Sequence, residues 1–258
     1  MKKKVFFLDI DGTLIPTKIG TRTQAPSAFD AAAIQKAQAL GHKVIFCTGR
    51  SYAIIPPPVK NAIHADGAVA GGGADVRLGD KRLYSRRLTD EQIRLILSLA
   101  HSRGARCYLE GESYNFGLYS RREDDARELG APENFPFGEA DAGVSKGTLF
   151  DDLSNPVYDP LRADFDLFAH PDYFDICLKG ETKARGMGLI MEALGMDRSQ
   201  AVAIGDSDND LEGILYAGCG VAMGNACESL KNAADMITLP LRESGAGHAI
   251  LKLIEEEA

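Results

Sequence analysis

The 258-residue sequence lacks several features that define other classes of protein. Its five cysteines are odd in number and widely spread, and no C-x-x-C pair occurs among them, so neither a disulfide framework nor a zinc cluster is expected. No apolar run approaches the roughly 18 residues of a membrane span. Positively charged residues are also in the minority, with 29 Lys and Arg compared with 37 Asp and Glu. That balance argues against nucleic acid or an anionic membrane as a partner. We therefore expect a globular protein of the reducing cytoplasm.

Both ends of the chain show the alternation of a parallel α/β sheet. The apolar run Val5–Leu8 is followed by apolar residues at helical spacing and then by a second apolar run, Val44–Phe46. Near the other end, a helical stripe precedes the apolar run Ala201–Ile204, and Val221–Met223 follows. These patterns predict an α/β fold in which one parallel sheet is covered by helices.

The middle of the chain has a different texture and predicts an inserted domain. Thr89-Asp90-Glu91-Gln92 has the pattern of a capping box, which predicts the start of a helix. Residues 134–160 are rich in Pro, Gly and Asp, so we expect mostly loop there. The candidate strands of this domain are 106–110, 114–119, 166–169 and 174–178. We assign residues 1–81 and 181–258 to a core domain and residues 82–180 to the insert.

An acidic turn follows the first predicted strand, at the sheet edge where ligands of open α/β sheets gather. In Asp9-Ile10-Asp11-Gly12-Thr13, two carboxylates two residues apart project the same way from extended chain, and Gly12 permits a sharp turn. Two such carboxylates repel each other unless a cation or a proton intervenes. A bound cation and a protonated carboxyl group both suit phosphoryl transfer with Mg²⁺, in which Asp9 attacks and Asp11 serves as acid and base. The alternative is a capped turn without chemistry.

A second polar turn, Cys47-Thr48-Gly49-Arg50, follows the second predicted strand. It combines a hydroxyl, a backbone amide that a ligand can approach closely and a guanidinium, which are three good phosphate donors. The alternative is an ordinary turn with a solvated arginine.

A third polar turn, Gly205-Asp206-Ser207-Asp208-Asn209-Asp210, follows a strand near the other end. It holds more acids than a helix cap needs, and Asp206 would complete an oxygen site for Mg²⁺ with the first acidic turn. Lys183, on the helix predicted before that strand, would supply a cation that steadies the charge on Asp9. An exposed lysine is the alternative.

These segments, in this order, resemble the haloacid dehalogenase (HAD) superfamily, and specifically its Cof-type branch (subclass IIB, with a C2 cap). The first family motif matches Asp9-x-Asp11-Gly12-Thr13, the second Thr48-Gly49-Arg50, the third Lys183 and the fourth Gly205-Asp206-x-x-Asn209-Asp210. Ala222-Met223-Gly224-Asn225-Ala226 also resembles the tail of this branch. The resemblance implies a Rossmann-like parallel-sheet core with an inserted α/β cap of the C2B type.

A competing match to the third motif lies at Val144-Ser145-Lys146-Gly147, which looks more like the branch's usual Ser-Lys-Gly than Thr182-Lys183-Ala184 does. Spacing favours Lys183, because the family's lysine lies one helix before the fourth motif. Lys146 instead lies inside the predicted insert.

The resemblance also implies a role for each matched residue. Asp9 would form an aspartyl-phosphate, with Asp11 as general acid and base. Mg²⁺ would be held by Asp9, the backbone carbonyl of Asp11, and Asp206. Asp210 would support the site by positioning Lys183 or a metal-bound water. The residues expected to contact the phosphate or substrate are Thr48, Gly49, Arg50, Lys183 and Asn209.

The expected function is Mg²⁺-dependent hydrolysis of small phosphomonoesters, such as sugar phosphates, flavin phosphates or pyridoxal phosphates. The partner is then a small phosphorylated molecule, with no nucleic acid and no membrane involved. One alternative is a phosphomutase, which returns the phosphoryl group to a sugar. Another is a phospho-aspartate signalling module, against which the insert and the second carboxylate of the first turn argue. Neither the substrate nor the oligomeric state follows from these patterns.

Overall fold

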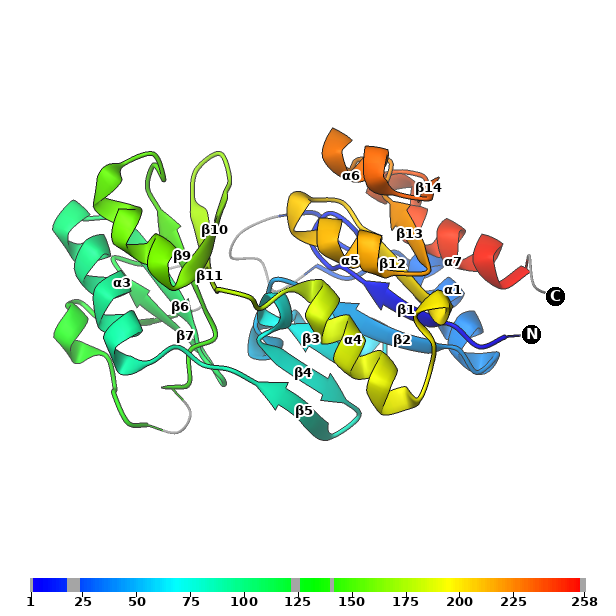
Figure 1. Cartoon of the computed structure of the whole chain (residues 1–258), viewed down its shortest axis with the longest axis horizontal. Coiled ribbons are helices and arrows are strands. Elements are labelled where there is room, and N and C mark those ends of the chain that lie inside the picture. Colours follow the sequence, from blue (N-terminus) through cyan, green and yellow to red (C-terminus); the bar gives the residue numbers. More distant parts are fainter. Residues whose placement is uncertain (1, 18–23, 122–125, 140–141, 256–258) are drawn as a thin grey trace. The chain divides into compact units, whose positions relative to one another are not determined.

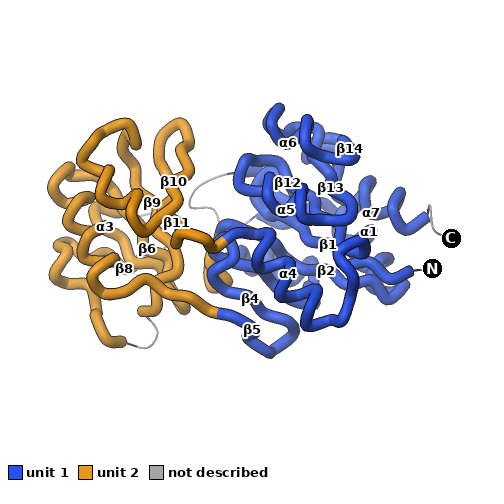
Figure 2. Tube along the Cα trace, in the orientation of Figure 1, with its two compact units in different colours: residues 1–49, 55–84, 182–258 blue, residues 50–54, 85–181 orange. Residues whose placement is uncertain are grey.

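The computed structural model of the protein describes residues 2–17, 24–121, 126–139 and 142–255. The chain divides into two compact units, shown in different colours in Figure 2. The first unit consists of Met1–Gly49, Ile55–Tyr84 and Thr182–Ala258. The second consists of Arg50–Ile54 and Ser85–Glu181. The short segment Arg50–Ile54 groups with the second unit although its first residue, Arg50, belongs to a motif that was predicted for the core domain. That the second unit serves as a cap stays a prediction.

The first unit is built on a sheet that has eight strands in the described residues, in the order β14-β13-β12-β1-β2-β3-β4-β5 (Figure 1). From β14 to β3 neighbouring strands run parallel, and β4 turns back antiparallel to β3. Every residue of β1 is buried, because parallel strands in the middle of a sheet are covered on both faces. The strands are β1 (Val5–Leu8), β2 (Lys43–Cys47), β3 (Gly67–Ala70), β4 (Asp75–Leu78), β5 (Lys81–Ser85), β12 (Ala201–Gly205), β13 (Cys219–Ala222) and β14 (Met236–Ile237).

Helices cover this sheet in two groups, with α1 packed on α7 and α4 packed on α5. Figure 1 shows α4 and α5 in front of the sheet. The connection from β1 to β2 runs along the sheet in one direction and that from β12 to β13 in the other, so right-handed crossovers put α1 and α5 on opposite faces. This doubly wound arrangement confirms the predicted fold class. The helices are α1 (Ala28–Ala39), α2 (Pro57–Ala62), α4 (Lys183–Leu194), α5 (Leu211–Tyr216), α6 (Glu228–Ala233) and α7 (Gly245–Glu255).

The second unit holds its own sheet, which has six described strands in the order β10-β11-β9-β6-β7-β8. Neighbouring strands run antiparallel except β7 and β8. Helix α3 (Asp90–Arg103) and the 3₁₀ helix η5 (Pro156–Ala163) pack together, and the apolar core of the unit includes Ile96, Leu109 and Ile176. The strands are β6 (Arg106–Glu110), β7 (Asn115–Leu118), β8 (Ala126–Glu128), β9 (Lys146–Phe150), β10 (Phe165–Ala169) and β11 (Phe174–Leu178).

Local sequence signals predict some elements of the second unit correctly and miss others. The capping box of α3 is confirmed, since Gln92 N–H donates to Thr89 Oγ1 (3.3 Å) and Thr89 N–H donates to Gln92 Oε1 (3.0 Å). The prediction of mostly loop at 134–160 missed the strand β9, which lies in the middle of the sheet between β6 and β11. Both neighbours of β9 supply backbone hydrogen bonds, and such pairing leaves no mark on local composition.

No helix of the described residues is long and apolar enough to cross a bilayer.

Candidate active site

The candidate site lies where three strands of the first unit end at one edge of its sheet. Asp9 follows β1, Asp206 follows β12 and Thr48 follows β2, and β1 pairs with both other strands. The Asp9 N–H donates to the Ile204 carbonyl at 3.0 Å, which extends the ladder into the site. Carboxylate oxygens of Asp9, Asp206 and Asp210 all lie within 4.8 Å of one another. The parallel sheet thus brings the first and fourth motifs together.

The turn after Asp9 packs directly against Asp206. Gly12 has φ +81°, a conformation that side chains rarely adopt, and its N–H donates to the Ile15 carbonyl at 2.7 Å. A Cβ on Gly12 would lie 2.0 Å from Asp206 Oδ2, so only glycine fits at this position. Asn225, a residue for which the sequence patterns predict no role, donates its side-chain amide N–H to the Gly12 carbonyl at 2.9 Å. Its place in the tail motif is the signal that points to it.

Lys183 is the first residue of α4, and its side chain reaches the acids of the site. Its Nζ donates to Asp9 Oδ1 at 2.7 Å, to Asn209 Oδ1 at 3.0 Å and to Asp210 Oδ1. A cation at a helix N-terminus opposes the helix dipole, so helix stability does not explain this lysine. Burial alone would lower the pKa of Lys183, but the charges of Asp210 and Asp9 outweigh burial and raise it. The lysine is therefore a permanent cation between two carboxylates.

Asp210 braces the fourth motif from inside. One oxygen of its carboxylate accepts from Lys183, and the other accepts the N–H groups of Asp206 (3.1 Å) and Ser207 (3.2 Å). A Cβ on Gly205 would lie 2.3 Å from Asp210 Cγ, so this turn also depends on a glycine. Because both Asp210 oxygens already have partners, the geometry favours a supporting role for it over a metal-ligand role.

The electrostatics of the site call for a further cation. Burial raises the pKa of Asp9 well above its usual value, and the charges of Asp210, Asp206 and Asp11 add to the rise while Lys183 opposes it. Burial and the charge of Asp210 raise the pKa of Asp206 to about 7. Asp206 Oδ1 is buried and accepts no hydrogen bond from the residues that the structure describes. Crowded carboxylates with an orphaned oxygen fit a hard, oxygen-binding ion such as Mg²⁺.

The remaining predicted residues divide between the two units. Thr48 is buried at the end of β2, where its N–H donates to the Val69 carbonyl (2.8 Å) and its carbonyl accepts from Gly72 (3.1 Å). Gly49 is the last residue of this stretch in the first unit, and Arg50 belongs to the second. The role of Arg50 at the phosphate stays a prediction. Lys146, the competing third-motif lysine, also lies in the second unit, on β9.

Comparisons with known proteins agree with this arrangement. The family model for haloacid dehalogenase-like hydrolases matches residues 6–250. The putative phosphatase YkrA of Bacillus subtilis is 28% identical, over 98% of each chain. The 5-amino-6-(5-phospho-D-ribitylamino)uracil phosphatase YcsE of B. subtilis is 26% identical, over 96% of this chain and 94% of its own. The solved structure of the HAD subclass IIB sugar phosphatase BT4131 superposes with a TM-score of 0.81 at 25% identity, covering 97% of this chain and 99% of its own.

The match to the family model spans most of the chain, and the relatives and the solved structure are aligned over nearly their full lengths. They confirm the predicted hydrolase class and Rossmann-like core, and they support action on small phosphorylated substrates. The chain therefore belongs to the haloacid dehalogenase-like hydrolase family, as an enzyme of its Cof-type branch.

Proposed function

We propose that the protein is a Mg²⁺-dependent phosphatase that hydrolyses small phosphomonoesters through a phosphoryl group carried on Asp9. The observation that carries this proposal is the hydrogen bond from buried Lys183 to Asp9 Oδ1, made beside the orphaned oxygen of Asp206. An ammonium fixed against one carboxylate, with a second carboxylate lacking a partner, suits a site that receives a phosphate and a metal ion together.

The metal would be held by Asp9, Asp206 and the backbone carbonyl of Asp11. Asp210 would contribute indirectly, because its two oxygens hold Lys183 and the backbone of the fourth motif. When bound, Mg²⁺ supplies positive charge against which a phosphate can approach these carboxylates. The ion also favours the ionised form of Asp9, whose pKa is otherwise raised by burial.

In the first half-reaction, the ionised Asp9 carboxylate attacks phosphorus and the bond from phosphorus to the alcohol oxygen breaks. Lys183 stays within reach of Asp9 Oδ1 and would balance charge on the transferring phosphoryl oxygens. Thr48 and Asn209, at the same edge of the sheet, would bind that group. Asp11 gives its proton to the departing alkoxide, so that a neutral alcohol leaves.

In the second half-reaction, water attacks the phosphoryl group on Asp9. Asp11, now ionised, removes a proton from that water, which returns Asp11 to its acidic form. Free phosphate leaves, and the Asp9 carboxylate is regenerated. Asp11 suits both steps because it is partly exposed beside the buried nucleophile, where alcohol and water can reach it. Relatives named for phosphatases of a ribitylamino-uracil phosphate and of sugars support phosphorylated polyols and sugars as the substrate class.

The test is a phosphate-release screen over sugar phosphates, flavin and pyridoxal phosphates and other metabolites, with and without Mg²⁺. Asp9→Asn should abolish turnover on every substrate that the wild type accepts, while the protein stays folded by circular dichroism. Asp208→Asn is the matched control, because Asp208 lies in the same acidic turn but is exposed and bonds to Ser229 instead. It should keep near-normal rates.

The same screen distinguishes the alternatives. A phosphomutase would move phosphate between positions of a sugar without releasing it. A signalling module would accumulate phosphorylated Asp9 with negligible turnover. Metal-dependent phosphate release by Asp9→Asn at wild-type rates would overturn the assignment of the nucleophile.

A further inference from the structure

The predicted phosphate loop, Thr48-Gly49-Arg50, contains the point at which the chain passes from the first unit to the second. Thr48 is tied to the first unit by backbone hydrogen bonds to Val69 and Gly72, at 2.8 and 3.1 Å. The next residues, Arg50–Ile54, group with the second unit, so the change falls at Gly49. A peptide bond joins Gly49 to Arg50, which means that whatever holds the Arg50–Ile54 segment also sets where the Arg50 guanidinium can reach.

Glu110, the last residue of β6, holds this segment to the second unit. Glu110 Oε2 accepts the Ser51 N–H at 2.7 Å, and the two residues are only 6% and 4% exposed. If a buried N–H loses its acceptor, the folded state bears the full free-energy cost of desolvating that N–H. This single hydrogen bond therefore contributes strongly to holding Ser51 in place. The Ser51 hydroxyl is also buried and has no hydrogen-bond partner among the described residues. Ser51 is therefore anchored through its backbone, by Glu110.

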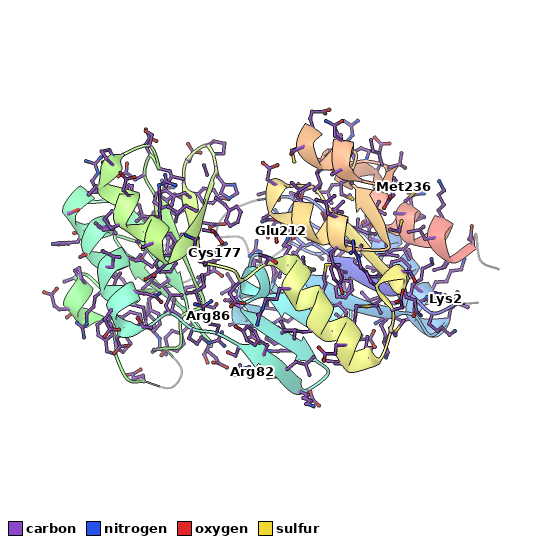
Figure 3. All side chains as sticks on the ribbon, in the orientation of Figure 1. Lys2, Arg82, Arg86, Cys177, Glu212 and Met236 are labelled. Atoms are coloured by element: carbon purple, nitrogen blue, oxygen red, sulfur yellow. The ribbon has the colours of Figure 1, made fainter. Side chains whose placement is uncertain are left out.

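Lys146, on the neighbouring strand β9, pairs with Glu110, and Asp175 on β11 in turn holds Lys146. Lys146 Nζ lies 2.8 Å from Asp175 Oδ2 and 3.8 Å from Glu110 Oε1, and the Thr148 hydroxyl donates to Asp175 Oδ1 at 2.7 Å. Cys177, labelled in Figure 3, stands opposite Lys146 in the register of β11 and β9. The three charged side chains are all buried.

Buried ion networks of this kind are a poor source of stability, because desolvation of the charges cancels most of their attraction. Their value lies in geometry, since each charged group restricts where its partner can lie. Burial raises the pKa of Glu110, and the charges of Lys146 and Arg50 oppose that rise. The backbone hydrogen bond from Ser51 likewise opposes the rise in the Glu110 pKa.

We propose that Glu110 is a positioning residue for the reaction: through the Ser51 backbone it sets the place of Arg50, and Lys146 with Asp175 sets the place of Glu110. This inference rests on the proposed function, in which Arg50 contacts the phosphate of the substrate. The Ser-Lys-Gly sequence that resembles a catalytic motif then serves the phosphate loop from the second unit.

The first test separates substrate binding from turnover. With the best substrate of the screen, Glu110→Ala should raise KM about tenfold, the value of one charged hydrogen bond, and change kcat less than about twofold. Glu110→Gln should keep KM near the wild-type value, because the amide oxygen of glutamine can accept the Ser51 N–H. In an Arg50→Ala background, Glu110→Ala should not raise KM further, because the contact between Arg50 and the phosphate, through which Glu110 acts, is already absent. Additive effects of the two changes would overturn the inference.

Glu128→Ala is the matched control for stability. Glu128 accepts the N–H groups of Tyr119 (3.1 Å) and Ser120 (2.8 Å) in the same unit, on β8, two strands from the strand β6 that carries Glu110. The Glu128→Ala variant should have a lower unfolding midpoint and an unchanged KM. An equal rise of KM in Glu128→Ala would show that general loosening of the unit, and not the Ser51 anchor, is responsible, and would overturn the inference.

A second measurement does not depend on activity. Hydrogen exchange of the Ser51 amide should be about tenfold faster in Glu110→Ala than in the wild type, and near wild type in Glu110→Gln. If the wild type releases phosphate from no substrate, the proposed function fails while this exchange still tests the anchor. Unchanged exchange at Ser51 in Glu110→Ala would overturn the positioning role whatever the activity.

Discussion

The carboxylate of Asp206 occupies the space that a side chain on Gly12 would need. A Cβ there would lie 2.0 Å from Asp206 Oδ2 and 2.5 Å from its Cγ. The two residues are far apart in sequence and come from the ends of adjacent strands, β1 and β12. One acidic motif is therefore shaped around the glycine of the other, and the distance between their carboxylates depends on that glycine.

Gly12→Ala should reduce kcat/KM more than about 100-fold, because it must displace Asp206 and small misplacements in a site cost that much. Its positive φ adds a cost of about 1–2 kcal/mol in the free energy of unfolding. Gly79→Ala is the matched control, since Gly79 has φ +55° and a Cβ added there would meet no atom within 4 Å. It should lose stability and keep kcat/KM. Equal activity in the two variants would contradict the interlocked turns.

Lys183→Met should lower the free energy of unfolding by about 3–5 kcal/mol, because it leaves the buried carboxylates of Asp9 and Asp210 without their cation. Turnover should be lost as well. Adding Asp210→Asn should recover part of the stability, by removing one of the uncompensated charges, and none of the turnover. Urea denaturation of the three proteins measures this. A single Lys183→Met variant as stable as the wild type would contradict it.

The affinity for Mg²⁺ should fall as pH drops below 7. Burial and the charge of Asp210 raise the pKa of Asp206 to about 7, so the ion-free protein increasingly holds a proton there below that pH. The ion must displace this proton, and at pH 6 binding should release about one proton per ion. Calorimetry in two buffers of different ionisation heat measures the release. An affinity that stays the same between about pH 6 and pH 8 would contradict Asp206 as a ligand.

Removal of the metal should silence the enzyme reversibly. Excess chelator should stop phosphate release, and added Mg²⁺ should restore it, because the uncompensated carboxylates of Asp9 and Asp206 otherwise disfavour an incoming phosphate. Asp206→Asn should behave as the chelated wild type does at any Mg²⁺ concentration. Full activity in excess chelator would remove the metal from the proposed function.

The stability contributed by Asp175 should disappear in acid. Burial alone would raise its pKa, but the charge of Lys146 and hydrogen bonds from Lys146 and the Thr148 hydroxyl outweigh burial and lower it to about 2. The unfolded value is about 3.9. A lowered carboxyl pKa gives stability that is complete above the unfolded value and is lost as pH falls through the folded value. The difference in unfolding free energy between wild type and Asp175→Asn should therefore shrink by about 2–3 kcal/mol from pH 5 to pH 2. A constant difference would contradict it.

Elements with strong local signals could be predicted from the sequence. Strand β1 is a continuous apolar run, and α3 begins at a capping box and ends at Gly104 with φ 60°. The strand β9 could not, because Lys146 and Thr148 give one of its faces the polarity of a loop. That face is buried by partners on β6 and β11, which only the tertiary structure supplies.

By itself, the sequence determined which chemical groups the protein has and the order in which they occur along the chain: Asp9 and Asp11, then Thr48, Lys183 and Asp206. It favoured Lys183 over Lys146 through the family resemblance, which implies a lysine one helix before the fourth motif. Tertiary structure decided what each group touches: Lys183 Nζ lies 2.7 Å from Asp9 Oδ1, and Asp206 lies against Gly12. In the second unit, it places Lys146 between Glu110 and Asp175. The reason is physical, since motifs record identity along the chain, whereas contacts between distant residues depend on strand order and close packing.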